Sequence, residues 1–111
     1  MRSFGLNGRL WHVVRVGPDS PALVDRTGKR TVATTDDASG IICLSDQISG
    51  DALARVAAHE VAHAAMCSFG LDRELAEMVR PEMRIRAEEW CCNLVADYGA
   101  GILSTAVGIL K

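Results

Sequence analysis

Short apolar runs separated by turn-forming residues occupy the first half of the chain. The clusters GPDSP, DRTGK and TDDASG lie between consecutive runs, and Gly, Pro, Asp and Ser are residues that favour turns. Most of the runs contain β-branched residues and all are too short for a helix, so we expect strands. The expected strands are residues 10–16, 22–24, 31–35 and 41–44. They predict a small antiparallel or mixed sheet.

Helical periodicity replaces this pattern in the second half of the chain. Apolar residues recur at helical spacing between Ser49, a favourable N-cap, and Gly70, a favourable C-terminal stop. We expect a shorter charged helix or loop over residues 71–80, ended by Pro81, and then a long helix over residues 82–103, interrupted late by glycines. Because the strands come first and the helices after, the chain is predicted to have an α+β fold.

The composition fits a single packed domain over residues 1–111, since 49% of the residues are hydrophobic. The formal net charge is −2 and the basic residues form no long block, so we expect neither nucleic acid nor an anionic membrane as a partner. The N-terminus lacks the apolar core of a signal peptide, and the apolar stretch 101–110 is shorter than the roughly 20 residues that span a bilayer. We therefore expect a cytoplasmic protein, with its oligomeric state left open.

The four cysteines do not form a Cys-x-x-Cys pair, so no four-cysteine zinc site is predicted. The adjacent Cys91 and Cys92 are poorly placed for a disulfide with each other. Small buried cysteines are common in protein cores, and without a secretion signal we expect reduced thiols.

The segment HEVAH, from His59 to His63, is the strongest chemical signal in the sequence. Residues four apart on a helix share one face, so the two imidazoles can bind one metal ion. Glu60 lies about 100° around the helix from His59, beside the ligand face, where it can take a proton from metal-held water as a general base. The alternative is that both histidines are hydrogen-bonded core residues. The apolar flanking residues favour the metal, because buried polar groups without strong partners are costly.

A catalytic zinc ion takes three protein ligands, so the chain must supply one more. A histidine six residues after His63 would be one solution, but that position is Phe69. His12 lies far away on an expected strand, and Cys67 would crowd one side of the metal from the same helix. Neither is expected to bind it.

The remaining candidates are the adjacent Glu88 and Glu89 on the last long helix. Glu89, Asn93 and Asp97 recur every four residues and form a polar line, which favours Glu89 over its rival Glu88 as the third ligand. Asn93 and Asp97 would then hold an imidazole nitrogen or the ligand carboxylate in place. The alternative is a polar stripe that faces solvent.

HEVAH and the later Glu89-Trp-Cys-Cys-Asn93 resemble the motifs of the gluzincin metallopeptidases, above all their small members, the minigluzincins and IrrE/ImmA-like proteases. The resemblance covers about residues 40–100 and combines HExxH with a downstream Glu-x-x-x-Asp/Asn helix. It implies a zincin-like fold, zinc held by His59, His63 and Glu89, and an origin in a phage or other mobile element. By order along the chain, the strand from Ile41 to Leu44 corresponds to the family's edge strand, which pairs with an extended substrate.

The favoured hypothesis is therefore a zinc-dependent peptidase with Glu60 as general base and a peptide or protein substrate added as a strand at Ile41 to Leu44. Two alternatives stay open: a zinc-bound regulatory or binding module without catalysis, and a metal-free α+β domain. The residue that stabilises the oxyanion is not assigned. Tyr98, the only tyrosine, falls on the far side of the helix from Glu89 and is expected to pack.

Overall fold

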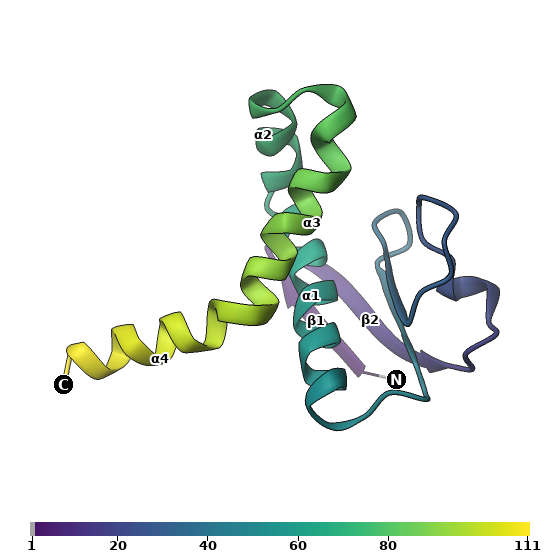
Figure 1. Ribbon diagram of the computed structural model, residues 1–111, viewed down its shortest axis with the longest axis horizontal. Helices are drawn as coiled ribbons and strands as arrows, with labels where there is room; N and C mark the ends of the chain where they lie inside the picture. The colour runs from purple at the N-terminus through teal and green to yellow at the C-terminus, as the bar shows by residue number, and fades with distance from the viewer. Residues whose placement is uncertain (1) are drawn as a thin grey trace.

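The computed structural model describes residues 2–111 and confirms the α+β fold, with a four-stranded sheet followed by helices (Figure 1). The spatial order of the strands is β1-β2-β4-β3. β2 pairs antiparallel with β1 and parallel with β4, and β3 pairs antiparallel with β4, so the sheet is mixed. The strands are β1 (Arg2–Leu6), β2 (Arg9–Val16), β3 (Ala33–Asp36) and β4 (Ile41–Ser45).

Two elements of the first half differ from the sequence prediction. β1 was not expected, and it joins β2 through Asn7 and Gly8, both with positive φ (50° and 77°), as a two-residue hairpin turn requires. Residues 22–23 of the expected strand 22–24 are instead part of a 3₁₀ helix, η1 (Pro21–Leu23), and Val24 forms only an isolated antiparallel bridge with Arg30. Pro21 is the first residue of this helix, and the Ser20 side chain accepts a hydrogen bond from the backbone N–H of Ala22. This local arrangement competes with a strand.

The expectation that the strand from Ile41 to Leu44 lies at the edge of the sheet is wrong. β4 pairs with β2 on one side and with β3 on the other, so its backbone cannot receive a further strand. Its side chains are nearly all buried, as in a strand covered by neighbours. The outer strand on this side of the sheet is β3.

The helices follow the predicted order with small shifts in their bounds. α1 (Gly50–Ser68) ends where expected, before Gly70, whose φ of 71° stops the helix. The predicted long helix begins after η2 (Pro81–Met83) and extends further than expected. It comprises α3 (Arg84–Leu94), the π-helical segment η3 (Val95–Gly99) and α4 (Ala100–Ile109), while α2 (Leu71–Met78) precedes η2. The glycines at its end therefore do not break the helix.

The hydrophobic core has two parts, and α1 lies between them. On one side, Trp11, Ile42 and Leu44 of the sheet pack with Ala64 of α1, and the Trp11 indole N–H donates to Ser68 Oγ at 2.8 Å. On the other side, a smaller cluster joins α1 to Cys92 of α3. The α1 helix is thus fixed between the sheet and α3, and its polar residues face the space where these two meet.

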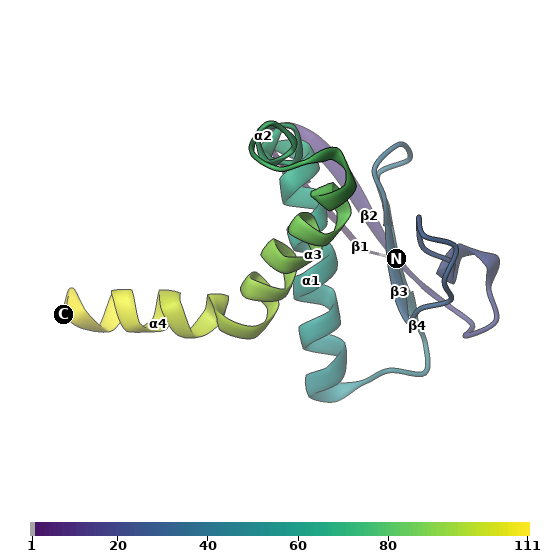
Figure 2. The same cartoon turned by 45° about the horizontal axis from the view of Figure 1, so that its top comes forward.

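α4 projects away from the rest of the molecule (Figures 1 and 2). The continuous helical segment Pro81–Ile109 is long and apolar enough to cross a membrane, judged by length and composition alone. The 18-residue window that meets this test is only 6% buried. The segment that meets this test is longer than residues 101–110, the apolar stretch expected from the sequence.

Candidate metal centre

His59 and His63 lie on the face of α1 that meets α3, as their spacing predicts. Their Nε2 atoms are 3.2 Å apart, and their side chains are 15% and 9% exposed. Two imidazole nitrogens this close together and this shielded from water can share one partner.

The carboxylate of Glu89, on α3, lies beside both of these nitrogens. Its Oε2 lies 2.9 Å from His59 Nε2, and its Oε1 lies 3.0 Å from His63 Nε2. Ligand atoms about 2.0–2.1 Å from one tetrahedral zinc ion lie about 3.3–3.4 Å from one another. The spacing within this trio is within a few tenths of an ångström of that value, and two imidazoles with one carboxylate are a donor set that suits zinc. Modest outward movement of the three side chains would admit the ion.

Glu88 takes a different place from its neighbour. Its Oε2 lies 2.5 Å from Nδ1 of His63, on the opposite side of the ring from Nε2. A carboxylate that accepts from Nδ1–H fixes the tautomer and leaves Nε2 as the ligand atom. Of the two candidates for the third ligand, Glu88 and Glu89, only Glu89 faces both Nε2 atoms.

The His63 imidazole is strongly basic in this setting. Burial lowers the pKa of His63, but hydrogen bonds with Cys92 and Glu88 outweigh that effect and raise it from 6.5 to about 10. Burial raises the pKa of Glu88, whereas His63 and Arg26 lower it, and the net direction is down. Without metal, the pair is therefore an imidazolium–carboxylate ion pair at neutral pH.

Glu60 lies beside this trio and is only 5% exposed. One of its carboxylate oxygens and one ring nitrogen from each of His59 and His63 lie within 4.8 Å of one another. Thr35 of β3 donates a hydrogen bond to Glu60 Oε1 at 3.2 Å. Burial raises the pKa of Glu60, although both histidines and Thr35 partly oppose the shift. A carboxylate next to the ligand atoms with a raised pKa has the properties of a general base.

The expected roles of Asn93 and Asp97 are wrong. Both residues bind Arg55 of α1 instead of an imidazole or Glu89. The Arg55 guanidinium donates to Asp97 Oδ1 at 2.7 Å and to Asn93 Oδ1 at 3.3 Å. The polar line on α3 therefore joins α3 to α1 through Arg55. Nδ1 of His59 is buried without a hydrogen-bond partner.

Arg26 reaches the site from the loop before β3 and was not singled out from the sequence. Its guanidinium lies 3.5 Å from Glu88 Oε2 and 3.6 Å from Glu89 Oε1. Asp25 holds this loop by accepting hydrogen bonds from the backbone N–H groups of Thr27 and Lys29, at 2.9 and 3.0 Å. The Asp-x-Thr-Gly turn signal was present in the sequence, but nothing in it indicates which helix the loop faces.

The remaining candidates from the sequence lie elsewhere. His12 is hydrogen-bonded to Ser3 in the sheet, and Cys67 accepts a hydrogen bond from Arg9 at 3.1 Å. Tyr98, expected to pack, is 63% exposed and far along η3. All four cysteines are free thiols.

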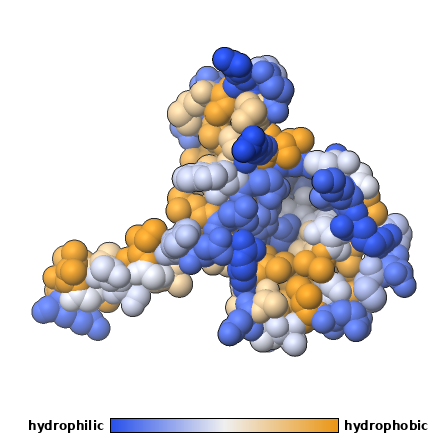
Figure 3. Space-filling model, in the orientation of Figure 1, coloured by the Kyte–Doolittle hydropathy of each residue, from blue (hydrophilic) through white to orange (hydrophobic). Residues whose placement is uncertain are grey.

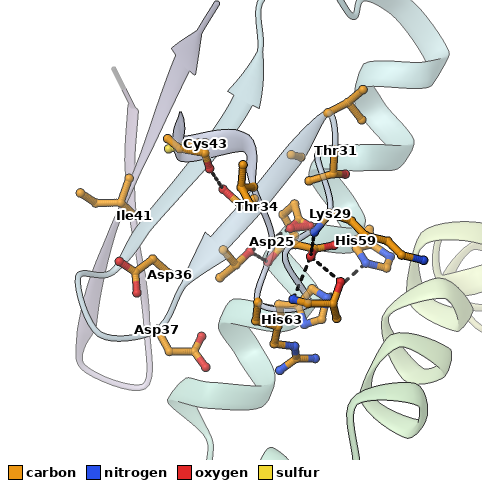
Figure 4. A pocket seen from close by; sticks show the side chains of 18 of the residues that line it. Asp25, Lys29, Thr31, Thr34, Asp36, Asp37, Ile41, Cys43, His59 and His63 are labelled. Atoms are coloured by element: carbon orange, nitrogen blue, oxygen red, sulfur yellow. Dashed lines mark hydrogen bonds between the residues drawn. The ribbon is translucent and has the colours of Figure 1, made fainter. Parts of the chain in front are cut away.

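A cleft of about 970 Å³ opens in front of the histidines, between the loop and β3 on one side and α1 with α3 on the other. The space-filling view shows it as a hollow bordered by hydrophilic side chains (Figure 3). Figure 4 shows His59 and His63 beside the loop that carries Asp25 and Lys29. The site is therefore open to a ligand larger than an ion.

Comparison with models of known protein families, with curated proteins and with solved structures finds no match for this chain.

Proposed function

We propose that this protein is a zinc-dependent peptidase. The observation that carries the proposal is the convergence of His59 Nε2, His63 Nε2 and the Glu89 carboxylate within 2.9–3.2 Å of one another. These three groups come from two helices, α1 and α3. The gluzincin resemblance, a cytoplasmic location and an origin in a mobile element are parts of the same proposal.

In this proposal His59, His63 and Glu89 hold the zinc ion. When bound, zinc lowers the pKa of a coordinated water toward about 7 and polarises a carbonyl group. Glu60 takes a proton from the attacking water and gives it to the leaving amine, for which its raised pKa is suited. Glu88 holds the His63 ring through Nδ1. Arg26 supplies a positive charge where negative charge develops on the carbonyl oxygen.

The substrate is a peptide, and we place it along the outer side of β3 rather than at β4. β3 is the edge strand next to the cleft, and among residues 2–111 no strand pairs with its outer side. Thr35, in the middle of β3, contacts Glu60 directly. An extended peptide added as a further strand would bring its carbonyl groups past the general base.

Metal content and hydrolysis together test the proposal. Protein expressed with supplementary zinc is expected to carry about one equivalent, since three-ligand sites bind zinc tightly, and to cleave members of a mixed peptide library analysed by mass spectrometry. Glu60→Gln should retain the zinc and lose cleavage by about 10²–10⁴-fold.

Two outcomes would contradict it. A protein that carries less than about a tenth of an equivalent of zinc has no functional metal centre. A protein that binds one equivalent but cleaves no peptide in the library has the properties of a zinc-binding module instead.

A further inference from the structure

The outward arm of the molecule, α4, exposes an apolar surface with no charged side chain between Asp97 and Lys111. Leu103, Ile109 and Leu110 are 68%, 80% and 85% exposed. Figure 3 shows hydrophobic side chains gathered on this arm. A monomeric protein in water rarely leaves a whole helix of this kind uncovered.

A second apolar surface lies on the body of the same chain. It is a groove of about 330 Å³ formed by α1, the start of α2 and the adjoining turns of α3 and η3. Every residue that lines it is apolar, and Val61, Leu71 and Val95 at its rim are 37%, 42% and 48% exposed. The lining residues are Ala58, Val61, Ala62, Ala65, Met66, Leu71, Cys91 and Val95.

The arm cannot fill the groove of its own chain while the fold is intact. α3, η3 and α4 form one continuous helical segment, and Val95 at the rim of the groove lies only one turn before α4 begins. Arg55 of α1 binds Asp97 at 2.7 Å and so fixes the base of the arm. α4 therefore leads away from the body (Figures 1 and 2).

The chain exposes more surface than a compact monomer of its mass. The accessible surface is 7398 Å², whereas a compact monomer of 11.9 kDa exposes about 5,900 Å². The radius of gyration is 14.7 Å, against about 13.2 Å expected for this length. The excess of roughly 1,500 Å² falls within the area that each partner of an obligate dimer buries.

We propose that two copies of this chain form a dimer by exchange of α4, each arm lying in the apolar groove of the other copy. A second copy then covers both apolar surfaces, whereas a lipid bilayer would cover the arm and leave the groove exposed. The candidate membrane span Pro81–Ile109 also includes α3 and η3. These two elements belong to the body, since Glu88, Glu89 and Asp97 bind residues of α1.

Analytical ultracentrifugation of the full chain tests this proposal, which does not depend on the metal. The wild type is expected to sediment at twice 11.9 kDa at micromolar concentration. Leu103→Glu on the arm and Val61→Arg in the groove should each weaken the dimer by about 30-fold or more. Both side chains are partly exposed, so the folded subunit should persist by circular dichroism. Leu71→Arg is a second groove variant, and Met78→Glu, 74% exposed and outside both surfaces, is the control.

Mixing the two variants gives the sharpest result. A mixed dimer of Leu103→Glu and Val61→Arg has one intact arm–groove contact, and its second contact pairs opposite charges, so the mixture should form dimers that neither variant forms alone. Two different arm variants, Leu103→Glu and Ile109→Glu, should not rescue each other.

A monomeric wild type overturns the proposal, as does a dimer insensitive to Val61→Arg. A monomer that floats with phosphatidylcholine vesicles, and does not when it carries Leu103→Glu, would assign the arm to lipid and equally overturn it.

Discussion

The carboxylate of Glu88 lies 2.5 Å from Nδ1 of His63. This contact divides two consecutive glutamates between two tasks, because Glu89 faces the Nε2 atoms of both histidines. One residue of difference along α3 turns a carboxylate by about 100°, so the two glutamates face opposite nitrogens of the His63 ring.

The two glutamates should therefore affect zinc affinity unequally. We expect Glu88→Gln to weaken zinc binding by about 10–100-fold, the usual effect of losing the partner of a metal-ligating histidine. Glu89→Gln should weaken it by more than about 100-fold, because a ligand is lost. Competition with a chromogenic chelator measures both, with the exposed Glu82→Gln as the control. Equal losses, or a larger loss for Glu88→Gln, would show that the assignment is reversed.

Zinc binding at neutral pH should release a proton from His63. The pKa of this imidazole is raised to about 10 in the metal-free protein, so the ring is protonated at pH 7, whereas a zinc ligand must be neutral. Zinc affinity should consequently rise with pH, by about tenfold per pH unit for each proton displaced. Calorimetry in two buffers of different ionisation enthalpy counts the protons. Release of no proton at pH 7 would contradict the ion pair with Glu88.

Arg26 should matter more for catalysis than for zinc binding. Its guanidinium contacts Glu88 and Glu89 at the longer limit of an ion pair and is 43% exposed, so its loss should change zinc affinity by no more than about fivefold. If it stabilises charge on the substrate carbonyl, Arg26→Ala should reduce kcat by about 10²–10³-fold. The matched control is Lys29→Ala, because Lys29 lines the same cleft but, among the described residues, is not a salt-bridge partner of Glu88 or Glu89. Equal kcat values for both variants would remove Arg26 from the catalytic role.

The two tryptophans offer a test of the core. Trp11 is fully buried between the sheet and α1, and its indole N–H binds Ser68, whereas Trp90 is 65% exposed. Trp11→Ala should lower the free energy of unfolding by about 3–5 kcal/mol, and Trp90→Ala should change it by about 0.5 kcal/mol or less. Urea denaturation followed by circular dichroism measures both. Similar effects of the two changes would contradict the packing of α1 on the sheet.

Local sequence patterns predicted the elements of this protein better than their pairing. The spacing of His59 and His63 and the polar line that begins at Glu89 follow from helix periodicity, which is a local property. The hairpin at Asn7 and Gly8 also had a local signal, since Asn-Gly favours tight hairpin turns, but the few apolar residues of β1 did not suggest a strand. The parallel pairing of β2 with β4 depends on contacts distant in sequence, and no local pattern marks it.

The same limit applies to the site. Arg26 approaches Glu88 across more than half of the chain, so its role depends on how the loop before β3 packs. Asn93 and Asp97 have the periodicity expected of residues that support a ligand, yet Arg55 binds them both. Periodicity indicates which side chains share a face, but the partner of that face is decided by tertiary packing.

Diffraction at the zinc absorption edge from crystals of the zinc-loaded protein tests the central claim most directly. We predict one anomalous peak about 2.0–2.2 Å from Nε2 of His59, Nε2 of His63 and the carboxylate of Glu89. A crystal soaked or grown with excess zinc that shows no peak at these atoms, or a peak only at Asp37, Cys67 and Asp72, the other cluster of metal-binding residue types, would contradict it.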